Sequence, residues 1–266
     1  MPVGSGGTTT ARLDTAAASL TIPSVGVVNT PDPILEVRVS IRTITVSVLS
    51  VTWGATSLVR DGFVSGTNCR VERWYCVGPP VGTNSVVITF TGGTTKAVGF
   101  ATPRYGVDQV DPISTAVTAT GNSTGPTVSI PVVDLPLNEN LATDILAAQE
   151  VTVTPVTATV VTQTQEGNDK TTGGPAGGNI LGACGQRTPT ANPTAMTWLL
   201  NTATFWAMAG SYWKPARERI SFNLSQPVAG VFGFTEISQQ VIDLQNQVRV
   251  LQSQVAYLER KVRRPI

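Results

Sequence analysis

Polar and apolar residues alternate with a period of two along much of residues 34–214, a pattern typical of half-buried β-strands. In the clearest strand one face is apolar and predicted to be buried: Leu35, Val37, Val39 and Ile41. The other face is polar and predicted to meet solvent: Glu36, Arg38, Ser40 and Arg42. The apolar parity then changes, which indicates a turn or bulge near Arg42-Thr43, because a strand cannot exchange faces without an extra residue.

Further short runs of the same kind follow, among them RVERWYCV, SVVITFT, KAVGFAT, TVSIPV, LATDILAA, AMTWLL and FWAMAGSYW. They are separated by turn-forming segments such as GPPVGTN and TGNSTGP, and by a long Gly-rich stretch at 167–193 that contains the loop-like GGNILGACGQ. LATDILAA would also suit a helix, but its place in a series of strands favours β structure. Many short strands without intervening amphipathic helices predict a two-sheet antiparallel sandwich.

The pattern changes to a heptad repeat between residues 234 and 262, where apolar residues recur at alternating spacings of four and three. This spacing is that of a left-handed coiled coil, whose narrow apolar seam must be buried against partner helices. The alternative, an amphipathic helix folded back on its own domain, is disfavoured by the glutamines that flank the seam. The predicted oligomerisation seam consists of Ile237, Val241, Leu244, Val248, Leu251, Val255, Leu258 and Val262.

These patterns divide the chain into four zones. Residues 1–33 are rich in Gly, Thr and Ala and are expected to form an N-terminal arm with one or two short strands. Residues 34–214 are expected to form the β-sandwich, and 215–233 a connector containing Pro and Gly. Residues 234–266 are expected to form the coiled-coil helix with its basic tail.

Composition removes several classes of function. Among 266 residues the charged ones make up 13% and the net charge is +1, so no electrostatic argument supports nucleic-acid or membrane binding. Histidine is absent, which excludes Ser-His-Asp and Cys-His catalysis and every histidine-ligated metal site. The N-terminus lacks the basic and apolar regions of a secretory signal, and no apolar run reaches the length of a membrane span. We therefore expect a protein made in the cytoplasm, with no enzymatic activity and no cofactor.

The three cysteines show no C-x-x-C spacing. Cys69 and Cys76 are expected on one strand at opposite parity, so their side chains should point to opposite faces and cannot pair with each other. Cys184 could pair with either one, and three free thiols are the simplest interpretation.

Three groups of residues are candidates for chemistry, each with a simpler structural interpretation. Oxygen ligands for Ca²⁺ would come from acidic residues that otherwise suit turns: Asp108, Asp111, Asp134, Glu139 and Asp144. A carboxylate pair for glycoside hydrolysis would come from residues that otherwise suit solvent-facing strand positions: Glu36, Glu72 and Glu150. A sugar-stacking platform would use aromatic residues that otherwise suit a core: Trp53, Trp74, Tyr75, Trp198, Trp206, Tyr212 and Trp213.

A basic cluster ends the chain and is the candidate docking site: Arg260, Lys261, Arg263 and Arg264. The helix macrodipole alone favours cations at a C-terminus. The functional alternative is a basic foot on the oligomer that docks on an acidic surface, where several copies add their charges.

The ordered motifs VTWGATSLV, RVERWYCVGPPVGTNSVVITFTG, KAVGFATPRYGVDQVDPI, TGNSTGPTVSIPV, AMTWLL and WAMAGSYWKP resemble jelly-roll, lectin-like β-sandwich modules. Such modules occur in secreted bacterial proteins and in tail, fibre and capsid-decorating proteins of bacteriophages. The expected fold class is therefore mainly β: an antiparallel jelly-roll-like β-sandwich followed by a C-terminal α-helical coiled coil.

The resemblance implies a virion-surface structural protein, such as a head fibre, spike or capsid decoration. Its expected partners are itself, other virion proteins of the capsid, and a host-surface glycan. A homotrimer is favoured because stalks of jelly-roll spikes are commonly threefold, whereas Val at a with Leu at d favours the alternative dimer. The alternative function is a cell-surface adhesin or carbohydrate-binding module.

Overall fold

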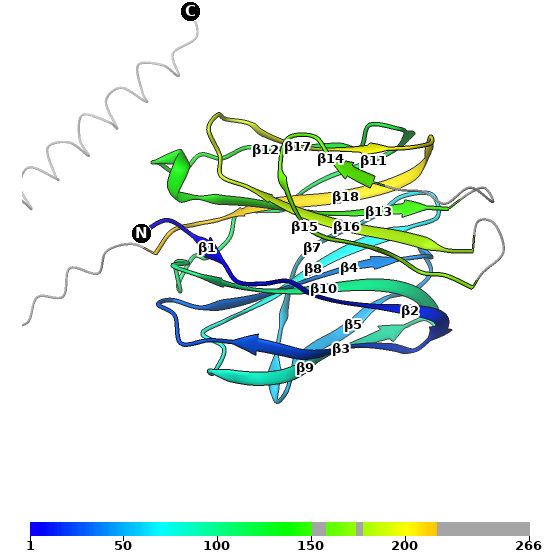
Figure 1. The fold of residues 1–266 in the computed structure, drawn as a ribbon, viewed down its shortest axis with the longest axis horizontal. Helices are drawn as coiled ribbons and strands as arrows, with labels where there is room; N and C mark the ends of the chain where they lie inside the picture. Colours follow the sequence, from blue (N-terminus) through cyan, green and yellow to red (C-terminus); the bar gives the residue numbers. More distant parts are fainter. Residues whose placement is uncertain (151–157, 174–177, 217–266) are drawn as a thin grey trace, which may run out of the picture. The chain divides into compact units, whose positions relative to one another are not determined.

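The computed structural model describes residues 1–150, 158–173 and 178–216, all within one compact unit of the chain, Met1–Glu218. The described strands form four antiparallel sheets, which stack as four layers (Figure 1). The chain is therefore mainly β, as the alternating pattern predicts. Most of the predicted connector and the whole predicted coiled coil lie outside the described residues.

The first two sheets form a sandwich from the N-terminal half of the chain. Its inner sheet consists, in spatial order, of β2 (Thr9–Ala17), β10 (Thr95–Tyr105), β4 (Ile34–Ile41), β8 (Arg70–Val77) and β7 (Val59–Ser65), with β1 (Gly4–Ser5) also pairing with β10. Its outer sheet consists of β3 (Ser19–Val27), β9 (Gly82–Thr91), β5 (Ser47–Trp53) and β6 (Thr56–Ser57).

The other two sheets form a second sandwich from the C-terminal half. Its inner sheet consists of β11 (Val117–Ser123), β18 (Thr204–Trp213), β13 (Leu141–Gln149), β16 (Ile180–Arg187) and β15 (Thr164–Lys170). Its outer sheet consists of β12 (Thr127–Ile130), β17 (Thr194–Leu200) and β14 (Ala158–Val160). A short 3₁₀ turn, η1 (Leu137–Glu139), precedes β13.

The two sandwiches repeat one chain path. If β1 and β6 are set aside and the strands of each half are numbered 1 to 8 in chain order, both inner sheets have the order 1-8-3-6-5 and both outer sheets the order 2-7-4. The sequence keeps a trace of this repetition in the second strand of each half, LTIP at 20–23 and VSIP at 128–131. The single sandwich expected over 34–214 is thus two sandwiches with one topology.

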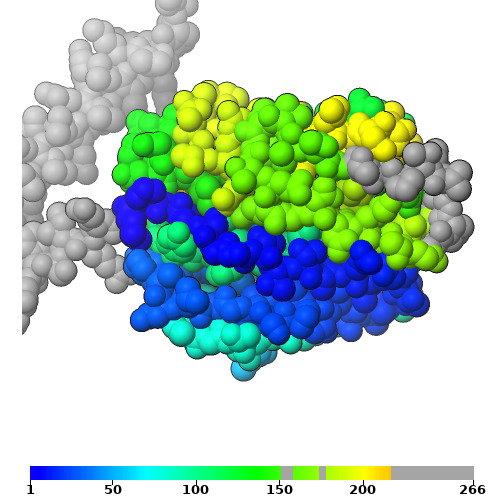
Figure 2. All heavy atoms as spheres, in the orientation of Figure 1, coloured from blue at the N-terminus to red at the C-terminus, as the bar shows by residue number. Residues whose placement is uncertain are grey.

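The inner sheets pack face to face with their strand orders reversed, so that β2 contacts β15, β10 contacts β16, and β7 contacts β11. The third strands of the halves, β4 and β13, meet near the centre of this contact. Both begin at the same end, where Ile34 and Leu141 belong to one apolar cluster with Trp213. The halves are therefore related by an approximate twofold axis along the strands, and Figure 2 shows them meeting along their length.

Apolar side chains fill all three interlayer spaces. One cluster lies between the sheets of the first sandwich and includes Trp53 and Phe90. A second fills the other sandwich around Trp198 and Met208. A third joins the two inner sheets through small and branched residues: Cys69, Val71, Val98, Phe100, Ile145, Ala147, Ile180, Cys184, Ala207 and Ala209.

Several local predictions can now be compared with the structure. LATDILAA forms β13, and the parity change near Arg42-Thr43 is a turn that carries the chain from the inner sheet to the outer one. The N-terminal arm, however, is not separate from the sandwich, because residues 9–27 form β2 and β3. GGNILGACGQ is not a loop: its residues 180–186 lie in the largely buried strand β16.

The polar face of residues 34–41 is the most informative correction. We expected Glu36, Arg38 and Ser40 to meet solvent, but every residue of β4 is buried. The face opposite the first core is covered by the second sandwich, so these polar groups lie inside the molecule.

Glycine in β16 tests how closely the two sandwiches approach. A Cβ at Gly182 would lie 2.9 Å from the Val98 Cβ and 3.0 Å from the Ser40 Oγ, both in the first sandwich. We expect Gly182→Ala to lower the free energy of unfolding by about 1–3 kcal/mol, because the interface has no room for a methyl group. Urea unfolding followed by tryptophan fluorescence measures this change.

Gly125→Ala is the matched control, since a Cβ there meets nothing within 4 Å. It should change stability by less than about 1 kcal/mol. Equal effects of the two substitutions would contradict close packing between the inner sheets.

Candidate functional site between the two sandwiches

The predicted oligomerisation seam and basic docking cluster, residues 237–264, lie outside the described residues. Their roles remain predictions from the sequence. The other candidates all fall within the described ranges and can be placed.

The aromatic residues considered for a sugar platform pack in the interior instead. Trp53, Trp198 and Trp213 are at most 1% exposed, and Trp74, Trp206 and Tyr212 are also buried. Tyr75 is half-buried and contacts Trp213 edge-to-face, with ring centroids 5.7 Å apart. The packing interpretation is therefore correct for this set.

The acidic residues considered for Ca²⁺ do not converge. In the part of the chain that the structure describes, no three His, Cys, Asp or Glu side chains are grouped so that they could hold a metal ion. Asp108 accepts hydrogen bonds from the backbone N–H groups of Val110 and Asp111, at 2.9 and 3.1 Å, as the turn interpretation requires. Asp144 lies in the second core, where its carboxylate accepts hydrogen bonds from Trp198 Nε1 at 2.7 Å and the Gly185 N–H at 2.7 Å.

The prediction that Glu36, Glu72 and Glu150 face solvent is wrong, since all three are at most 6% exposed. Glu72 accepts hydrogen bonds from Arg70 Nε at 2.7 Å and from the Val48 N–H at 2.9 Å, which ties β8 to β5. Their partners are side chains and backbone groups of the same unit, so these carboxylates hold strands together.

Glu36 is the centre of a buried ionic network on the inner face of the first sandwich. Its carboxylate accepts hydrogen bonds from Arg104 Nη2 at 2.6 Å and Arg73 Nη2 at 3.1 Å, and it lies 3.7 Å from Arg38 Nε. Across the interface, Thr143 Oγ1 donates to it at 3.1 Å. The three arginines come from β4, β8 and β10, so one carboxylate joins three neighbouring strands.

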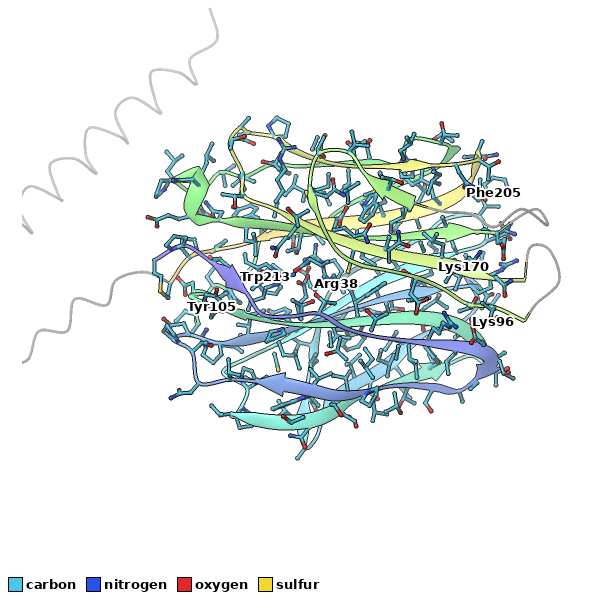
Figure 3. All side chains as sticks on the ribbon, in the orientation of Figure 1. Arg38, Lys96, Tyr105, Lys170, Phe205 and Trp213 are labelled. Atoms are coloured by element: carbon cyan, nitrogen blue, oxygen red, sulfur yellow. The ribbon has the colours of Figure 1, made fainter. Side chains whose placement is uncertain are left out.

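The same arginines bind the second sandwich directly. Glu166 on β15 accepts from Arg104 Nη1 at 2.6 Å and forms an ion pair with Arg38 Nη1 at 2.8 Å. Arg38 Nη1 also donates to the carbonyl oxygen of Asp144 at 3.2 Å, and Arg73 Nη1 to that of Thr143 at 3.0 Å. Figure 3 shows Arg38 between the layers.

A β-bulge in each half places one further carboxylate at the interface between the sandwiches. The pairing register shifts between Arg60 and Gly62 in β7, and between Gln165 and Gly167 in the equivalent strand β15. The bulged residues are Asp61 and Glu166. Asp61 lies 3.4 Å from Arg73 Nε, and Glu166 binds two arginines as described above.

Glycine follows the acidic residue in both bulges for a steric reason. A Cβ on Gly62 would lie 2.6 Å from the Ala116 Cβ, and one on Gly167 would overlap the ring of Phe100. The repeated acid-glycine pair therefore allows a carboxylate to enter the interface while the backbone passes close to a neighbouring element.

The electrostatics of the network favour ionised carboxylates. Burial by itself would raise the pKa of Glu36, but attraction to Arg38, Arg104 and Arg73 outweighs it and lowers the pKa to about 2. Burial and the same kind of attraction compete at Glu166, whose pKa is also lowered by Arg104 and Arg38. Asp61 is the exception, because burial raises its pKa more than Arg73 lowers it.

Asp144 differs because no arginine side chain donates to its carboxylate. Burial raises its pKa to about 7, although Trp198 and Gly185 donate hydrogen bonds that favour the charged form. Its two oxygens accept these bonds and one from Gln163 Nε2 at 3.1 Å, so it fixes β13 against β16 and β17.

This network is suited to holding the two sandwiches together rather than to catalysing a reaction. Arg38, Arg73 and Arg104 are at most 1% exposed, so a solute cannot reach them without separating the sandwiches. The three cations face Glu36, Asp61 and Glu166, so the charges nearly balance in the interior. Buried pairs of this kind cost desolvation energy but strongly penalise any arrangement that leaves one charge alone.

The free cysteines are consistent with an inert interior. Cys69, Cys76 and Cys184 are all buried and unpaired in disulfides. Cys76 lies in β8 and Cys69 directly precedes that strand rather than lying in it, but the two belong to different core clusters, in line with the opposite faces expected for them. Burial raises the pKa of Cys69 to about 12 and that of Cys76 to about 11, so both are protonated thiols at neutral pH.

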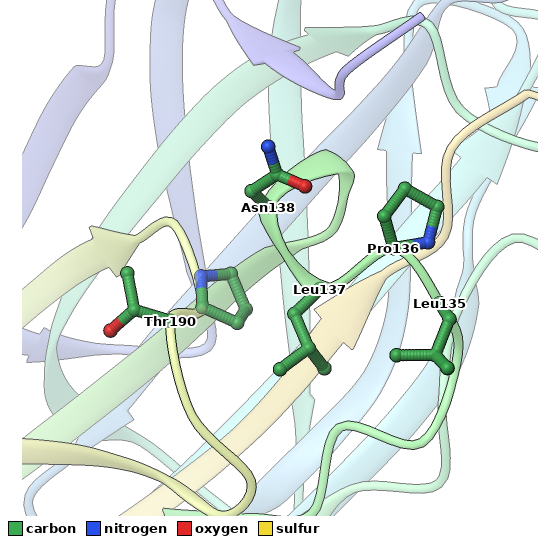
Figure 4. Close-up of a pocket in the computed structure, with 6 residues that line it drawn as sticks. Leu135, Pro136, Leu137, Asn138 and Thr190 are labelled. Carbon is green, nitrogen blue, oxygen red and sulfur yellow. The ribbon is translucent and has the colours of Figure 1, made fainter.

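An open groove lies on the surface of the second sandwich, beside the turn before β13. Its volume is about 710 Å³, and it is lined by Leu135, Pro136, Leu137, Asn138, Pro189 and Thr190 (Figure 4). This lining has no charged or nucleophilic side chain beyond one threonine hydroxyl, so the groove suits an apolar contact.

Comparison of the chain with protein-family models, curated proteins and solved structures gives no match. Within the described ranges, no helix has the length and apolar character needed to cross a membrane.

Sequence reasoning missed Arg73, Arg104, Asp61 and Glu166 as members of a site. A charged residue at every second position of a strand is usually a sign of a solvent-facing side. The available signal was the repeated acid-glycine pair in two equivalent strands, and it becomes visible only once the halves are aligned.

The network predicts a pH-dependent stability that depends on Glu36. Its pKa is lowered from 4.5 to about 2, so its contribution is complete above pH 4.5 and is lost as the pH falls toward 2. We expect Glu36→Gln to lower the free energy of unfolding at pH 7 by about 3–5 kcal/mol, because the arginines lose a buried partner. The variant should also lose less stability than the native chain between pH 4.5 and 2. Denaturant unfolding across this range measures both effects.

Asp169→Asn is the matched control, because Asp169 pairs with Arg12 at the surface at 2.9 Å. It should cost less than about 1 kcal/mol. A Glu36→Gln variant as stable as this control would show that the network does not hold the sandwiches together.

Proposed function

We propose that this chain is a non-enzymatic structural protein of the virion surface, such as a bacteriophage head fibre, spike or capsid decoration. In this proposal the folded unit Met1–Glu218 is the exposed body. The heptad segment joins several copies into one oligomer, and the basic cluster at residues 260–264 docks on the particle.

The order of the strands supports assigning a jelly roll to each sandwich. In a jelly roll, strands 1, 8, 3 and 6 form one sheet and strands 2, 7, 4 and 5 the other. Both halves follow this order, except that strand 5 lies beside strand 6 in the inner sheet. Jelly rolls are common in viral capsid proteins and in lectins, so the fold supports the proposed class by analogy.

The observation that carries the proposal is the enclosed ionic interface between two such units. The polar groups between the two sandwiches bind one another and so join the halves. A duplicated sandwich held together in this way is suited to mechanical durability. The described carboxylates that were candidates for catalysis bind arginines, lysines or backbone groups within the unit, as Glu36 does with Arg104 at 2.6 Å.

The heptad segment supports an oligomer. Its seam, from Ile237 to Val262, requires partner helices. The resemblance to jelly-roll spikes favours a homotrimer, and Val at a with Leu at d favours the alternative dimer. Several bodies on one stalk bind a repetitive surface with an avidity that single contacts lack.

The alternative, a carbohydrate-binding adhesin, has weaker support. The described tryptophans are buried, and the exposed Phe63 is already stacked against the chain's own cations. The guanidinium carbons of Arg60 and Arg70 lie 4.7 and 4.2 Å from its ring centroid. This ring is therefore a poor platform for a sugar.

Immunolabelling tests the proposal directly. Gold-conjugated antibodies raised against the purified chain should decorate the outside of intact virus particles released from cells that carry the gene. Prior absorption of the antibodies with the purified chain should abolish the label. Label confined to the cell envelope, with bare particles, would contradict the virion role and favour the adhesin.

A further inference from the structure

Loops from both sandwiches meet at one end of the folded unit, which we call the loop end: residues 28–33, 77–82, 106–116 and 131–140. Backbone hydrogen bonds join these loops across the sequence. Gly78 N–H donates to the Pro33 carbonyl at 2.9 Å, and Gly106 N–H to that of Pro31 at 2.9 Å. The loop end is thus a continuous surface.

Side chains fix the loop of the second sandwich to the same surface. Tyr212 Oη donates to Asp134 at 2.6 Å, and Lys214 Nζ lies 2.6 Å from Asp111 and 3.9 Å from Asp134. Asn140 Nδ2 donates to the carbonyl oxygens of Asp134 and Pro136 at 2.9 and 3.1 Å. The loops are therefore held in place before any partner arrives, which lowers the entropy cost of binding.

This end is unusually apolar. Of the 13 large hydrophobic side chains exposed in the described residues, six lie in these loops: Val28, Val77, Val81, Val110, Val133 and Leu135. A seventh, Met1, lies beside Gly106. Val110 and Leu135 are 86% and 81% exposed, and the groove of Figure 4 adjoins Leu135. Clustered apolar side chains on a rigid surface mark an interaction site more often than scattered ones do.

Charge at the loop end cannot draw two copies of this surface together. Its loops contain five carboxylates, Asp32, Asp108, Asp111, Asp134 and Glu139, and no lysine or arginine, while the nearby Lys214 lies 2.6 Å from Asp111 and 3.9 Å from Asp134. Like copies therefore offer one another no ion pairs here, so the exposed valines and Leu135 must supply the attraction between them.

The described chain ends at this same surface. Ala216 N–H donates to the Gly106 carbonyl at 2.8 Å, and Pro215 pairs with Val107. The predicted heptad segment begins at Phe234, so its start is tethered to the loop end by a stretch that can span at most about 60 Å. In a parallel coiled coil the helices of all copies start at the same level. The loop end of each copy is therefore held within about 60 Å of this common start.

We infer that the loop end is a docking surface for the loop end of a second copy of this chain. The inference rests on the oligomer in the proposed function. Tethering through a linking segment of this length gives effective concentrations of about millimolar, so even a weak apolar contact is occupied. Val110, Val133 and Leu135, with the groove beside them, form the contact on each copy.

Disulfide trapping in the full chain tests this inference. Asn138 is exposed on the groove rim, and the three native cysteines are buried, so Asn138→Cys adds one accessible thiol. Under mild oxidation we expect this variant to form intersubunit disulfides at least about tenfold faster than Leu199→Cys, because contact raises the local thiol concentration. Leu199 is the matched control, since it is 54% exposed on β17 and away from the loop end.

A second substitution separates docking from tethering. Adding Leu135→Asp to the Asn138→Cys variant should slow trapping by about tenfold, because an apolar contact is replaced by a charge. Adding Leu199→Asp instead should leave the rate unchanged. Light scattering on each variant should show the same oligomer.

Any of four results would overturn the inference. Equal trapping at positions 138 and 199 would show that the loop ends do not meet. Fast trapping that Leu135→Asp does not change would show that the tether alone brings them together. A monomer at micromolar concentration would remove the oligomer of the proposed function, and the docking surface with it, whereas an intact oligomer without trapping would remove only the docking surface.

Discussion

The structure depends on the carboxylate of Glu36, which is buried among Arg38, Arg73 and Arg104. Three cations on adjacent strands repel one another, and they cannot be buried away from water without anionic partners. Glu36 supplies one partner from within the first sandwich, and Glu166 supplies another from the second. The second sandwich is therefore required to complete the interior of the first.

The two halves share a chain path but contribute differently to their contact. The first brings its arginines, while the facing strands of the second offer Ile145, Ala147 and backbone carbonyl groups. Such an asymmetric contact favours one pairing of the halves within a chain, because like faces from two chains would bring cations or unpaired carbonyls together. This specificity keeps the pairing of the two halves within one chain.

Much of the fold could be predicted from the sequence, but its layering could not. Period-two alternation correctly identified β4 and the antiparallel class, and the core roles of Trp53 and Trp198 followed from their strand positions. The same alternation gave the wrong environment for Glu36, because a solvent-facing side and an ionic interface have identical periodicity. Residues 9–27 form the two strands expected in the arm, but the sequence did not show that they join the sandwich, since Thr- and Ala-rich residues 9–17 lie at an inner-sheet edge where small polar side chains suffice.

The central claim is that the ionic interface makes the two sandwiches one cooperative unit. Native-state hydrogen exchange of the full chain, followed at the amides of β4 and β13 in increasing denaturant, tests it most directly. We expect both strands to open with the same free energy of opening and the same dependence on denaturant concentration. Opening of β13 at a clearly lower free energy than β4 would show that the sandwiches unfold independently and would contradict the account.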